Sequence, residues 1–417
     1  QGAVAVVAIL VASLWWWRRQ DGGSGASAGH GTTKMLAAAA LPKDRGSALL
    51  LRPLQLRGLA LRNRLVRAAA FGGSSVSAMH DCHVEAALGG CGMSTLAYAC
   101  VSPDGRTFAS QLVLTRLTAA QREGLRRMTE SVREAGGAMS VQLTHAGGFA
   151  NRAVIGGRQG APSPTFSPAN LNWSRALTRA DLDAIDAAFA ESGRIAVREL
   201  GFDAIELHCG HGYLLSQFLS PSRNVRADEW GGDPTPSARD PTVYEGGRFA
   251  FPLRVLRSVR RAVGDDVPIL VKLNVDDGFA SSGLTVEHAC QFARACEAAT
   301  CDCIVPSCGY VDMNGFHMLR GAVPLWNMVW AIPGVVEKIA LALFGKWLVP
   351  HVPFERQFLR KEAVRVLESV DKVHVALLGG VRTWRGMEGA LARGFALVQT
   401  ARTLIREPDF VQKVESR

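Results

Sequence analysis

The sequence is short of tyrosine and has no closely clustered cysteines. Its 417 residues include 4 Tyr against 9 Trp and 17 Phe. The 9 Cys never occur as C-x-x-C, and their spacings do not match those that bind iron–sulfur clusters. Most of them lie in apolar stretches, as Cys301 and Cys303 do. We therefore expect reduced, buried thiols in a reducing compartment.

Other signatures are missing as well. There is no H-E-x-x-H zinc motif, and no G-x-G-x-x-G follows an early strand, which disfavours a doubly wound dinucleotide-binding sheet. Hydrophobic residues make up 48% and charged residues 20%, so a disordered, collagen-like or coiled-coil chain is excluded. The net charge of +10 comes without a nucleic-acid-binding motif, and we interpret it as membrane-related or incidental.

The sequence opens with an uncharged apolar run. Residues 3–17 read AVAVVAILVASLWWW and are followed by Arg18 and Arg19. A bilayer span needs about 20 apolar residues, with a lower limit of about 17. Tryptophans beside arginines are typical of a membrane–water interface, and the basic residues follow the run instead of preceding it, unlike a signal peptide. We therefore predict an N-terminal apolar anchor helix within residues 1–20, with the following domain on the cytoplasmic side.

A tether and a basic stretch follow the predicted anchor. Residues 21–47 are rich in Gly and Ser, and we expect a flexible linker there. Between Arg45 and His80 there are six Arg and no acidic residue. This stretch is interpreted either as a solvated basic face or as a contact with anionic lipid headgroups. The remaining domain would span residues 48–417.

Short apolar runs alternate with helical patterns throughout that domain. Continuous apolar runs are typical of parallel strands buried on both faces. Eight such runs are predicted as strands, at residues 65–70, 95–101, 138–143, 202–208, 267–274, 302–307, 373–378 and 395–400. Helices are predicted from Thr118, from Thr178 to Leu200, and over 249–263, 285–299, 358–369 and 383–392. The pattern predicts an α/β fold, a (β/α)8 TIM barrel.

A TIM barrel places its active residues at the carboxyl ends of the strands. His208 ends the fourth predicted strand, Lys272 lies near the end of the fifth, and Gln142 near the end of the third. Phosphate sites in this fold follow strands seven and eight. The residues at these two places are Gly379-Gly380 and Ala401-Arg402.

The stretch HCGHGYLLSQFLSP, residues 208–221, resembles the signature of the Old Yellow Enzyme family, also called the NADH:flavin oxidoreductase/NADH oxidase family. The resemblance extends from about residue 50 to 408. It includes LRNRLV (61–66), VSPDGR (101–106), VQLTHAG (141–147), KLN (272–274), GGV (379–381) and RTLIREP (402–408).

The resemblance implies bound FMN and a small-molecule substrate, with diffusible NADH or NADPH as the reductant. His208 and His211 would hold the substrate oxygen, as oxyanion-hole donors do, and Tyr213 would give a proton to the substrate. The implied cofactor-binding residues are Ala69, Ala70, Tyr98, Gln142, Lys272, Gly379, Gly380, Ala401 and Arg402. Lys272 would face the part of the flavin that becomes negative on reduction.

The sequence departs from the family pattern at several positions. Ala401 replaces the usual Gly at the phosphate, Gly148 replaces a frequent Arg, and Tyr98 is larger than usual. The insertion DPTPSARDPTV, residues 233–243, precedes Arg248 where an Asn and a first Arg are usual. We expect these changes to affect FMN binding and turnover more than the fold.

A second insertion, residues 325–354, is apolar and aromatic, with helical spacing from Ile339 to Leu348. Three interpretations are open, namely a lid over the flavin, a membrane contact beside the anchor, and packing against the barrel.

The sequence thus indicates a membrane-tethered, FMN-dependent oxidoreductase of ene-reductase type, which reduces an electron-poor alkene with NAD(P)H. Two alternatives stay open. One is a metal-dependent TIM-barrel lyase or hydrolase using His208, His211 and Glu206. The other is a catalytically impaired, membrane-bound flavin-binding barrel.

Overall fold

The computed structural model describes residues 48–70, 75–167, 172–279, 282–331, 335–348 and 351–416. The predicted anchor and the linker lie outside these residues. Among the helices that are described, none is long and apolar enough to cross a membrane.

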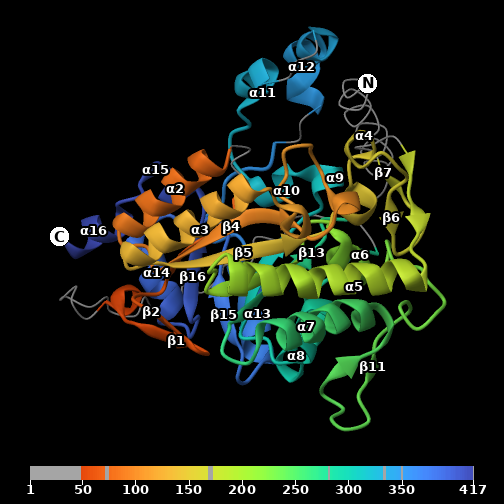
Figure 1. Ribbon diagram of the computed structural model, residues 1–417, viewed down its shortest axis with the longest axis horizontal. Helices are drawn as coiled ribbons and strands as arrows, with labels where there is room; N and C mark the ends of the chain where they lie inside the picture. Colours follow the sequence, from red (N-terminus) through yellow and green to blue (C-terminus); the bar gives the residue numbers. More distant parts are fainter. Residues whose placement is uncertain are drawn as a thin grey trace, which may run out of the picture.

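The eight predicted strands form one closed barrel (Figure 1). They are all parallel and join in the order β10-β13-β14-β15-β16-β3-β4-β5. Their bounds are β3 Leu65–Arg67, β4 Met93–Cys100, β5 Ala138–Thr144, β10 Ala204–Cys209, β13 Ile269–Asp276, β14 Cys303–Cys308, β15 His374–Leu377 and β16 Leu397–Thr400. The predicted (β/α)8 barrel is confirmed, and its parallel strands are buried as their apolar runs predicted.

Helices surround the barrel and connect consecutive strands. They are α2 Val76–Leu88, α3 Ala119–Glu134, α5 Arg179–Arg194, α7 Ala250–Val263, α8 Val286–Ala298, α13 Arg360–Ser369 and α14 Trp384–Leu391, followed by α15 Arg402–Arg406 and α16 Phe410–Glu415. Thr118 and Thr178 form the capping boxes that the sequence predicted for α3 and α5. A π-helical turn, Ile195–Glu199, extends α5 to the predicted end near Leu200.

A hairpin closes one end of the barrel. Strands β1 (Leu54–Leu56) and β2 (Leu59–Leu61) pair antiparallel before the first barrel strand. Leu56 and Leu61 pack with inward-facing barrel residues such as Val66 and Leu270. The amino ends of the barrel strands are therefore filled with apolar side chains, and polar chemistry is left to the carboxyl ends.

The loops at the carboxyl ends carry the additional elements. After β5 come α4 (Arg152–Ile155) and the short strand pairs β6 (Gly160–Ala161) with β9 (Arg175–Ala176), and β7 (Phe166–Ser167) with β8 (Asn172–Trp173). Helix α6 (Leu214–Leu219) follows β10, and α9 (Val311–Asn314) and α10 (Phe316–Leu319) follow β14.

The first insertion is an ordered hairpin. Strands β11 (Thr235–Pro236) and β12 (Tyr244–Glu245) pair antiparallel. Arg248, which is buried, forms an ion pair with Asp233 and donates through Nε to the carbonyl oxygen of Leu219 at 3.2 Å. One arginine thus fixes this corner even though the usual Asn and first Arg are missing.

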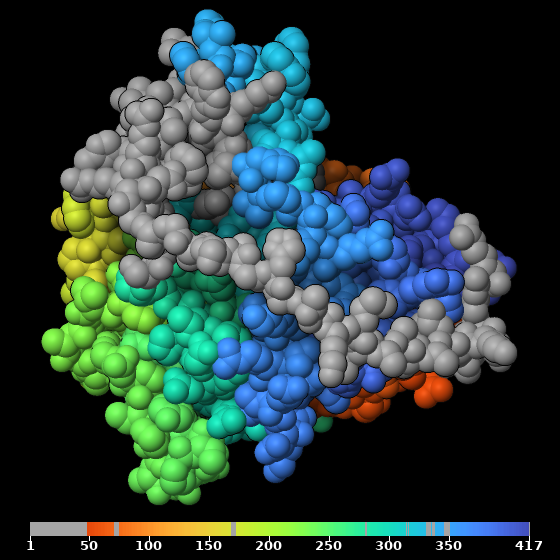
Figure 2. Space-filling model, turned by 180° about the vertical axis from the view of Figure 1, so that it is seen from behind, coloured from red at the N-terminus to blue at the C-terminus, as the bar shows by residue number. Residues whose placement is uncertain are grey.

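The second insertion forms two helices, α11 (Leu325–Ala331) and α12 (Val335–Leu348), that stand away from the barrel (Figure 1). Trp326 is 64% exposed, Trp330 77% and Leu343 67%. Packing against the barrel, one of the three interpretations of this segment, therefore does not describe these side chains. Helices α11 and α12 are also at the top of Figure 2.

Candidate active site

The centre of the barrel mouth is a buried polar cluster on three adjacent strands, β5, β10 and β13. Side chains alternate along a strand, so Glu206 and His208 of β10 point into the barrel with Gln142 of β5 and Lys272 of β13. The register pairs Glu206 with Gln142, and His208 with Lys272. Glu206 Oε1 accepts from Lys272 Nζ at 2.9 Å and from Gln142 Nε2 at 2.7 Å.

His208 and His211 lie at the end of β10, where the chain turns sharply. His211 adopts a left-handed φ of 59°, and its backbone N–H donates to Asn274 Oδ1 at 3.0 Å. Its Nε2 lies 2.6 Å from Ser307 Oγ. The next residue must be glycine, because a Cβ on Gly212 would lie 2.4 Å from the Tyr310 ring. The two imidazole rings are 4.9 Å apart and nearly perpendicular.

Tyr213 precedes the first residue of α6 and completes an aromatic group. Its ring centroid lies 4.5 Å from His208, 5.3 Å from Tyr98 and 5.8 Å from Phe149. Two of these contacts are edge-on, an arrangement that aromatic rings favour. The structure therefore brings the three predicted catalytic residues together with Tyr98.

Burial sets the protonation states of these groups. Burial is the main reason why the pKa of His208 lies well below 6.5, and the nearby His211 and Lys272 lower it further. Burial and then Lys272 lower the pKa of His211 to about 3. Burial and then Tyr98 raise the pKa of Tyr213 well above 10. At neutral pH the site therefore presents two neutral imidazoles and a neutral phenol, each of which has a proton to donate.

The loops after β15 and β16 lie side by side, as the predicted phosphate site requires. The carbonyl oxygen of Val381 accepts from Thr400 Oγ1 at 3.2 Å and from Thr403 Oγ1 at 3.4 Å. Gly379 and Gly380 have φ of 94° and 70°, which only glycine adopts readily. Ala401 has a φ of −98°, so its methyl group is not strained there.

The remaining predicted residues lie at the same end of the barrel. Arg402 begins α15 and donates to the Arg320 carbonyl oxygen at 3.0 Å. Ala69 and Ala70 are half-buried just after β3. The backbone N–H of the preceding Ala68 donates to the Thr400 carbonyl oxygen at 3.1 Å, which joins the two strand ends.

Gln399 is a further candidate for the site, and it was not among the residues predicted from the sequence. It is fully buried on β16, and both its amide nitrogen and its amide oxygen lack a hydrogen-bond partner among the described residues. Glu206 Oε2 and His208 Nδ1 lack one as well. Leu397, two residues before Gln399 on β16, packs in the barrel interior. The two-residue period of this strand was therefore the signal that would have found Gln399.

These unpaired polar atoms fit a polar, planar ligand such as the pyrimidine edge of FMN. Buried polar groups are normally hydrogen-bonded, and an unpaired one needs a partner that the protein does not itself supply. Gln142, Lys272 and Gln399 would hold that edge, and Gly379, Gly380 and Arg402 would hold the phosphate. The cofactor-binding roles predicted for Gln142, Lys272, Gly379, Gly380 and Arg402 are therefore compatible with bound FMN.

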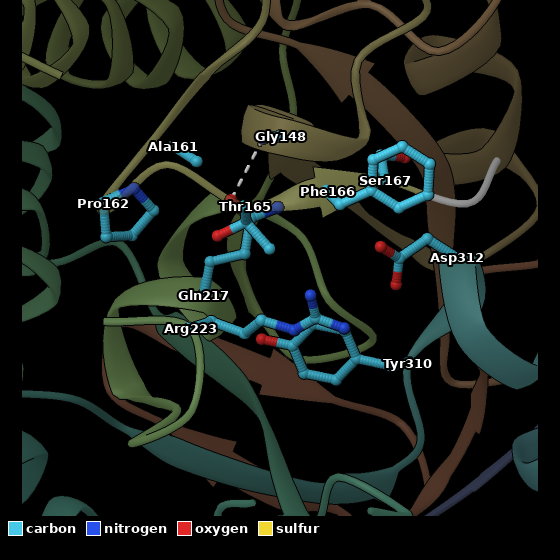
Figure 3. Close-up of a pocket in the computed structure, with 10 residues that line it drawn as sticks. All are labelled: Gly148, Ala161, Pro162, Thr165, Phe166, Ser167, Gln217, Arg223, Tyr310 and Asp312. Atoms are coloured by element: carbon cyan, nitrogen blue, oxygen red, sulfur yellow. Dashed lines mark hydrogen bonds between the residues drawn. The ribbon is translucent and has the colours of Figure 1, made fainter. Parts of the chain in front are cut away.

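A small pocket lies between the loop after β5, helix α6 and the loop after β14 (Figure 3). The Arg223 guanidinium is 5.5 Å from the centroid of the Tyr310 ring and 5.1 Å from that of Phe279. Tyr310 Oη and Asp312 Oδ1 are buried without a hydrogen-bond partner among the described residues. The cavity of about 10 Å³ has room for about one water-sized group. Its lining residues are Gly148, Ala161, Pro162, Thr165, Phe166, Ser167, Gln217, Arg223, Tyr310 and Asp312.

The alternative metal site does not form from its three candidate ligands. Glu206 is bound by Lys272 and Gln142, and it lies one inward-facing position below His208. Within the part of the chain that the structure describes, no group of three or more His, Cys, Asp or Glu is arranged to hold a metal ion.

Comparison with known proteins gives consistent matches. The sequence model of the NADH:flavin oxidoreductase / NADH oxidase family matches residues 49–318. A 4,4'-dithiodibutanoate disulfide reductase of Rhodococcus erythropolis is 36% identical over 370 residues, which cover 87% of each chain. An NADPH dehydrogenase of Geobacillus sp. is 30% identical over 63% of this chain and 74% of its own. The Old Yellow Enzyme homologue of Zymomonas mobilis has the same fold, with a TM-score of 0.65 at 19% identity over 88% of this chain and 92% of its own.

Proposed function

This chain belongs to the NADH:flavin oxidoreductase / NADH oxidase family, and on that basis we propose that it reduces an electron-poor alkene conjugated to a carbonyl group. It is an oxidoreductase whose cofactors are FMN and the reductant NADH or NADPH. The observation that carries the alkene proposal is the close grouping of His208, His211 and Tyr213. The His208 ring lies 4.5 Å from that of Tyr213 and 4.9 Å from that of His211.

FMN, when bound, supplies two-electron chemistry by accepting hydride from the nicotinamide and passing it to the substrate. The neutral imidazoles of His208 and His211 would donate hydrogen bonds to the substrate carbonyl oxygen, where negative charge develops. Ser307 and Asn274 orient His211 through its ring and its backbone. Lys272 would stand near the reduced ring, and Glu206 keeps its ammonium in place.

Tyr213 would supply the proton. Hydride is added to the β-carbon, electrons move to the carbonyl oxygen, and the phenol then protonates the α-carbon, so the alkene gains two hydrogens. A high pKa suits this step, because a carbanion-like carbon is a strong base and the phenol must stay protonated until it meets one.

Disulfide reduction is a second candidate function. The relative that is 36% identical over 87% of this chain reduces the disulfide of 4,4'-dithiodibutanoate. In this chain, hydride addition to one sulfur would break the S–S bond and release a thiolate, and protonation would give two thiols. His208 and His211 would stabilise that thiolate as they would an enolate oxygen.

One assay tests both candidates. The purified full chain, loaded with FMN, is given NADPH or NADH with either a cyclic enone or 4,4'-dithiodibutanoate, without oxygen. We expect oxidation of the nicotinamide with the enone and formation of the saturated ketone. Turnover of the disulfide alone would replace the first proposal by the second. Reduction of neither acceptor, with FMN bound, would support a catalytically impaired barrel.

We further propose that the protein is associated with a membrane, through residues 1–20 and helices α11 and α12. The support is the apolar run 3–17 in the sequence, together with the exposed apolar side chains of α11 and α12. Lys338 Nζ lies 6.0 Å from the centroid of the Trp330 ring, and a cation beside tryptophan is typical of a membrane–water interface. The catalytic domain would then face the cytoplasm.

A further inference from the structure

A second cleft lies at the rim of the barrel, next to the site predicted for the FMN phosphate. It forms between the loop after β15 and the amino ends of α13 and α14, segments that are blue in Figure 2. Its volume is about 430 Å³, within the range of small-molecule sites. We call it the arginine cleft, and its lining residues are Arg356, Gln357, Arg360, Gly380, Val381, Arg382, Thr383, Arg385 and Gly386.

The arginine cleft is strongly positive. Arg356, Arg360, Arg382 and Arg385 are exposed, and none of them forms an ion pair with a carboxylate among the described residues. Glu355, the acid next to Arg356 in the chain, is paired with Arg320 at 3.0 Å. Four guanidinium groups without a carboxylate partner surround one hollow, and they repel one another unless an anion joins them.

The cleft also holds donors in fixed positions. The guanidinium of Arg382 lies over the Phe354 ring at 3.7 Å from the centroid, which restricts its orientation. Thr383 caps α14 by accepting from the backbone N–H of Gly386 at 3.2 Å, and Gln357 Nε2 donates to the Gly386 carbonyl oxygen at 2.8 Å. The positive end of the α14 dipole therefore adds to the arginine charges.

This cleft shares only Gly380 with the residues predicted to hold the FMN phosphate. The carbonyl oxygen of Val381 is directed to Thr400 and Thr403, so one side of the loop after β15 faces β16 and Arg402. The arginine cleft lies on the other side, towards α13, and neither Ala401 nor Arg402 lines it.

We propose that the arginine cleft binds a terminal phosphate of an adenine nucleotide, either the 2'-phosphate of NADPH or the 3'-phosphate of a coenzyme A thioester. Arginine forks match phosphate oxygens in paired hydrogen bonds. The cleft is larger than a single phosphate requires, and it opens at the same end of the barrel as the chemistry. The proposal rests on the proposed function, because a nucleotide must come to this rim to take part.

The test is direct binding to the full chain loaded with FMN, which needs no turnover. Titration calorimetry compares 2',5'-ADP, 3',5'-ADP and 5'-AMP, and the double variant Arg356→Gln/Arg385→Gln is measured beside Arg393→Gln, an exposed arginine outside the cleft. We expect one of the bisphosphates to bind at least about tenfold more tightly than 5'-AMP, and the double variant to lose that advantage. Preference for 2',5'-ADP assigns NADPH, and preference for 3',5'-ADP assigns the thioester.

Three outcomes would overturn the proposal. Equal affinity for all three nucleotides would show that the extra phosphate is not recognised. Loss of FMN from the double variant would assign the cleft to the flavin phosphate. Weaker binding of the double variant to vesicles of anionic lipid, with nucleotide binding unchanged, would assign it to lipid headgroups. An absence of enone or disulfide reduction would refute the proposed function without affecting this measurement.

Discussion

Lys272 Nζ lies 2.9 Å from Glu206 Oε1 in the centre of the barrel, and both side chains are almost completely shielded from solvent. Each charge is compensated by the other, and Gln142 adds a hydrogen bond to the same carboxylate oxygen. Removing one partner of a buried pair leaves an uncompensated charge, which is far more costly than removing a pair at the surface.

Lys272→Met is therefore expected to lower the free energy of unfolding by about 3–5 kcal/mol in urea denaturation. Lys272→Arg should keep most of the stability because it keeps the charge. As a control, Arg365→Met breaks the exposed pair with Glu287 and should change stability little. Equal stability of Lys272→Met and the wild type would show that Lys272 and Glu206 do not form a charged pair.

Tyr213→Phe should slow reduction of the alkene by about 10²- to 10⁴-fold, because the phenol proton is lost while the ring stays. Reduction of the flavin by NADH or NADPH should be almost unchanged, since that step needs no proton from Tyr213. Stopped-flow absorbance follows the two half-reactions separately. Tyr244→Phe, on the hairpin far along the chain from the site, is the control. An equal loss in both half-reactions would refute the role of proton donor.

Ala401→Gly should strengthen FMN binding several-fold, because it restores close approach of the backbone to the phosphate. The φ of −98° at this position is open to either residue, so the change adds no strain. Flavin fluorescence during titration of the apoprotein measures the Kd. Ala392→Gly, an exposed position at the end of α14, controls for added backbone flexibility. Weaker binding of Ala401→Gly would show that the methyl group does not crowd the phosphate.

Acid should destabilise the protein below about pH 6.5. Burial lowers the pKa of His83 and of His211 to about 3 from 6.5. Between these two pH values the unfolded chain binds more protons than the folded one. The stability that the two neutral histidines contribute is therefore fully present above pH 6.5 and is lost as the pH falls towards 3. Each histidine contributes a slope of roughly 1.4 kcal/mol per pH unit in that window.

His83→Gln tests this dependence away from the active site, since His83 Nδ1 lies 2.6 Å from Ser94 Oγ in the buried contact between α2 and β4. Urea denaturation at several pH values should give a shallower slope for the variant than for the wild type. His374→Gln, at a half-buried position, should change the slope less. Parallel curves for His83→Gln and the wild type would contradict the lowered pKa.

The double variant Trp326→Ser/Trp330→Ser should partition onto lipid vesicles at least about tenfold less than the wild type, because two large apolar side chains no longer enter the interface. Vesicle co-sedimentation of the full chain measures the partition. Trp173→Ser is the control, since Trp173 is 55% exposed but lies on β8. If the Trp173 variant loses as much binding as the double variant, α11 and α12 are not the membrane contact.

The barrel could be predicted because its strands are continuous apolar runs, which local sequence reveals. The caps at Thr118 and Thr178 were equally visible, since a capping box needs only residues three apart. Helix α2 was missed because it has a weak apolar stripe and includes His80, Asp81 and His83 in its two central turns. Its position depends on the contact with β4, as the His83–Ser94 bond shows.

By itself, the sequence determined which residue types stand at the strand ends, because the two-residue period of a strand and the motif around His208 are local properties. Only the tertiary structure decided which of them meet. Glu206 joins Gln142 and Lys272 across 64 and 66 residues of chain, and Gln399 joins the same interior from the last strand. Closure and register of the barrel fix these contacts, and they likewise bring the arginines of two helix ends around one cleft. Such contacts arise from packing between distant segments, which no local pattern encodes.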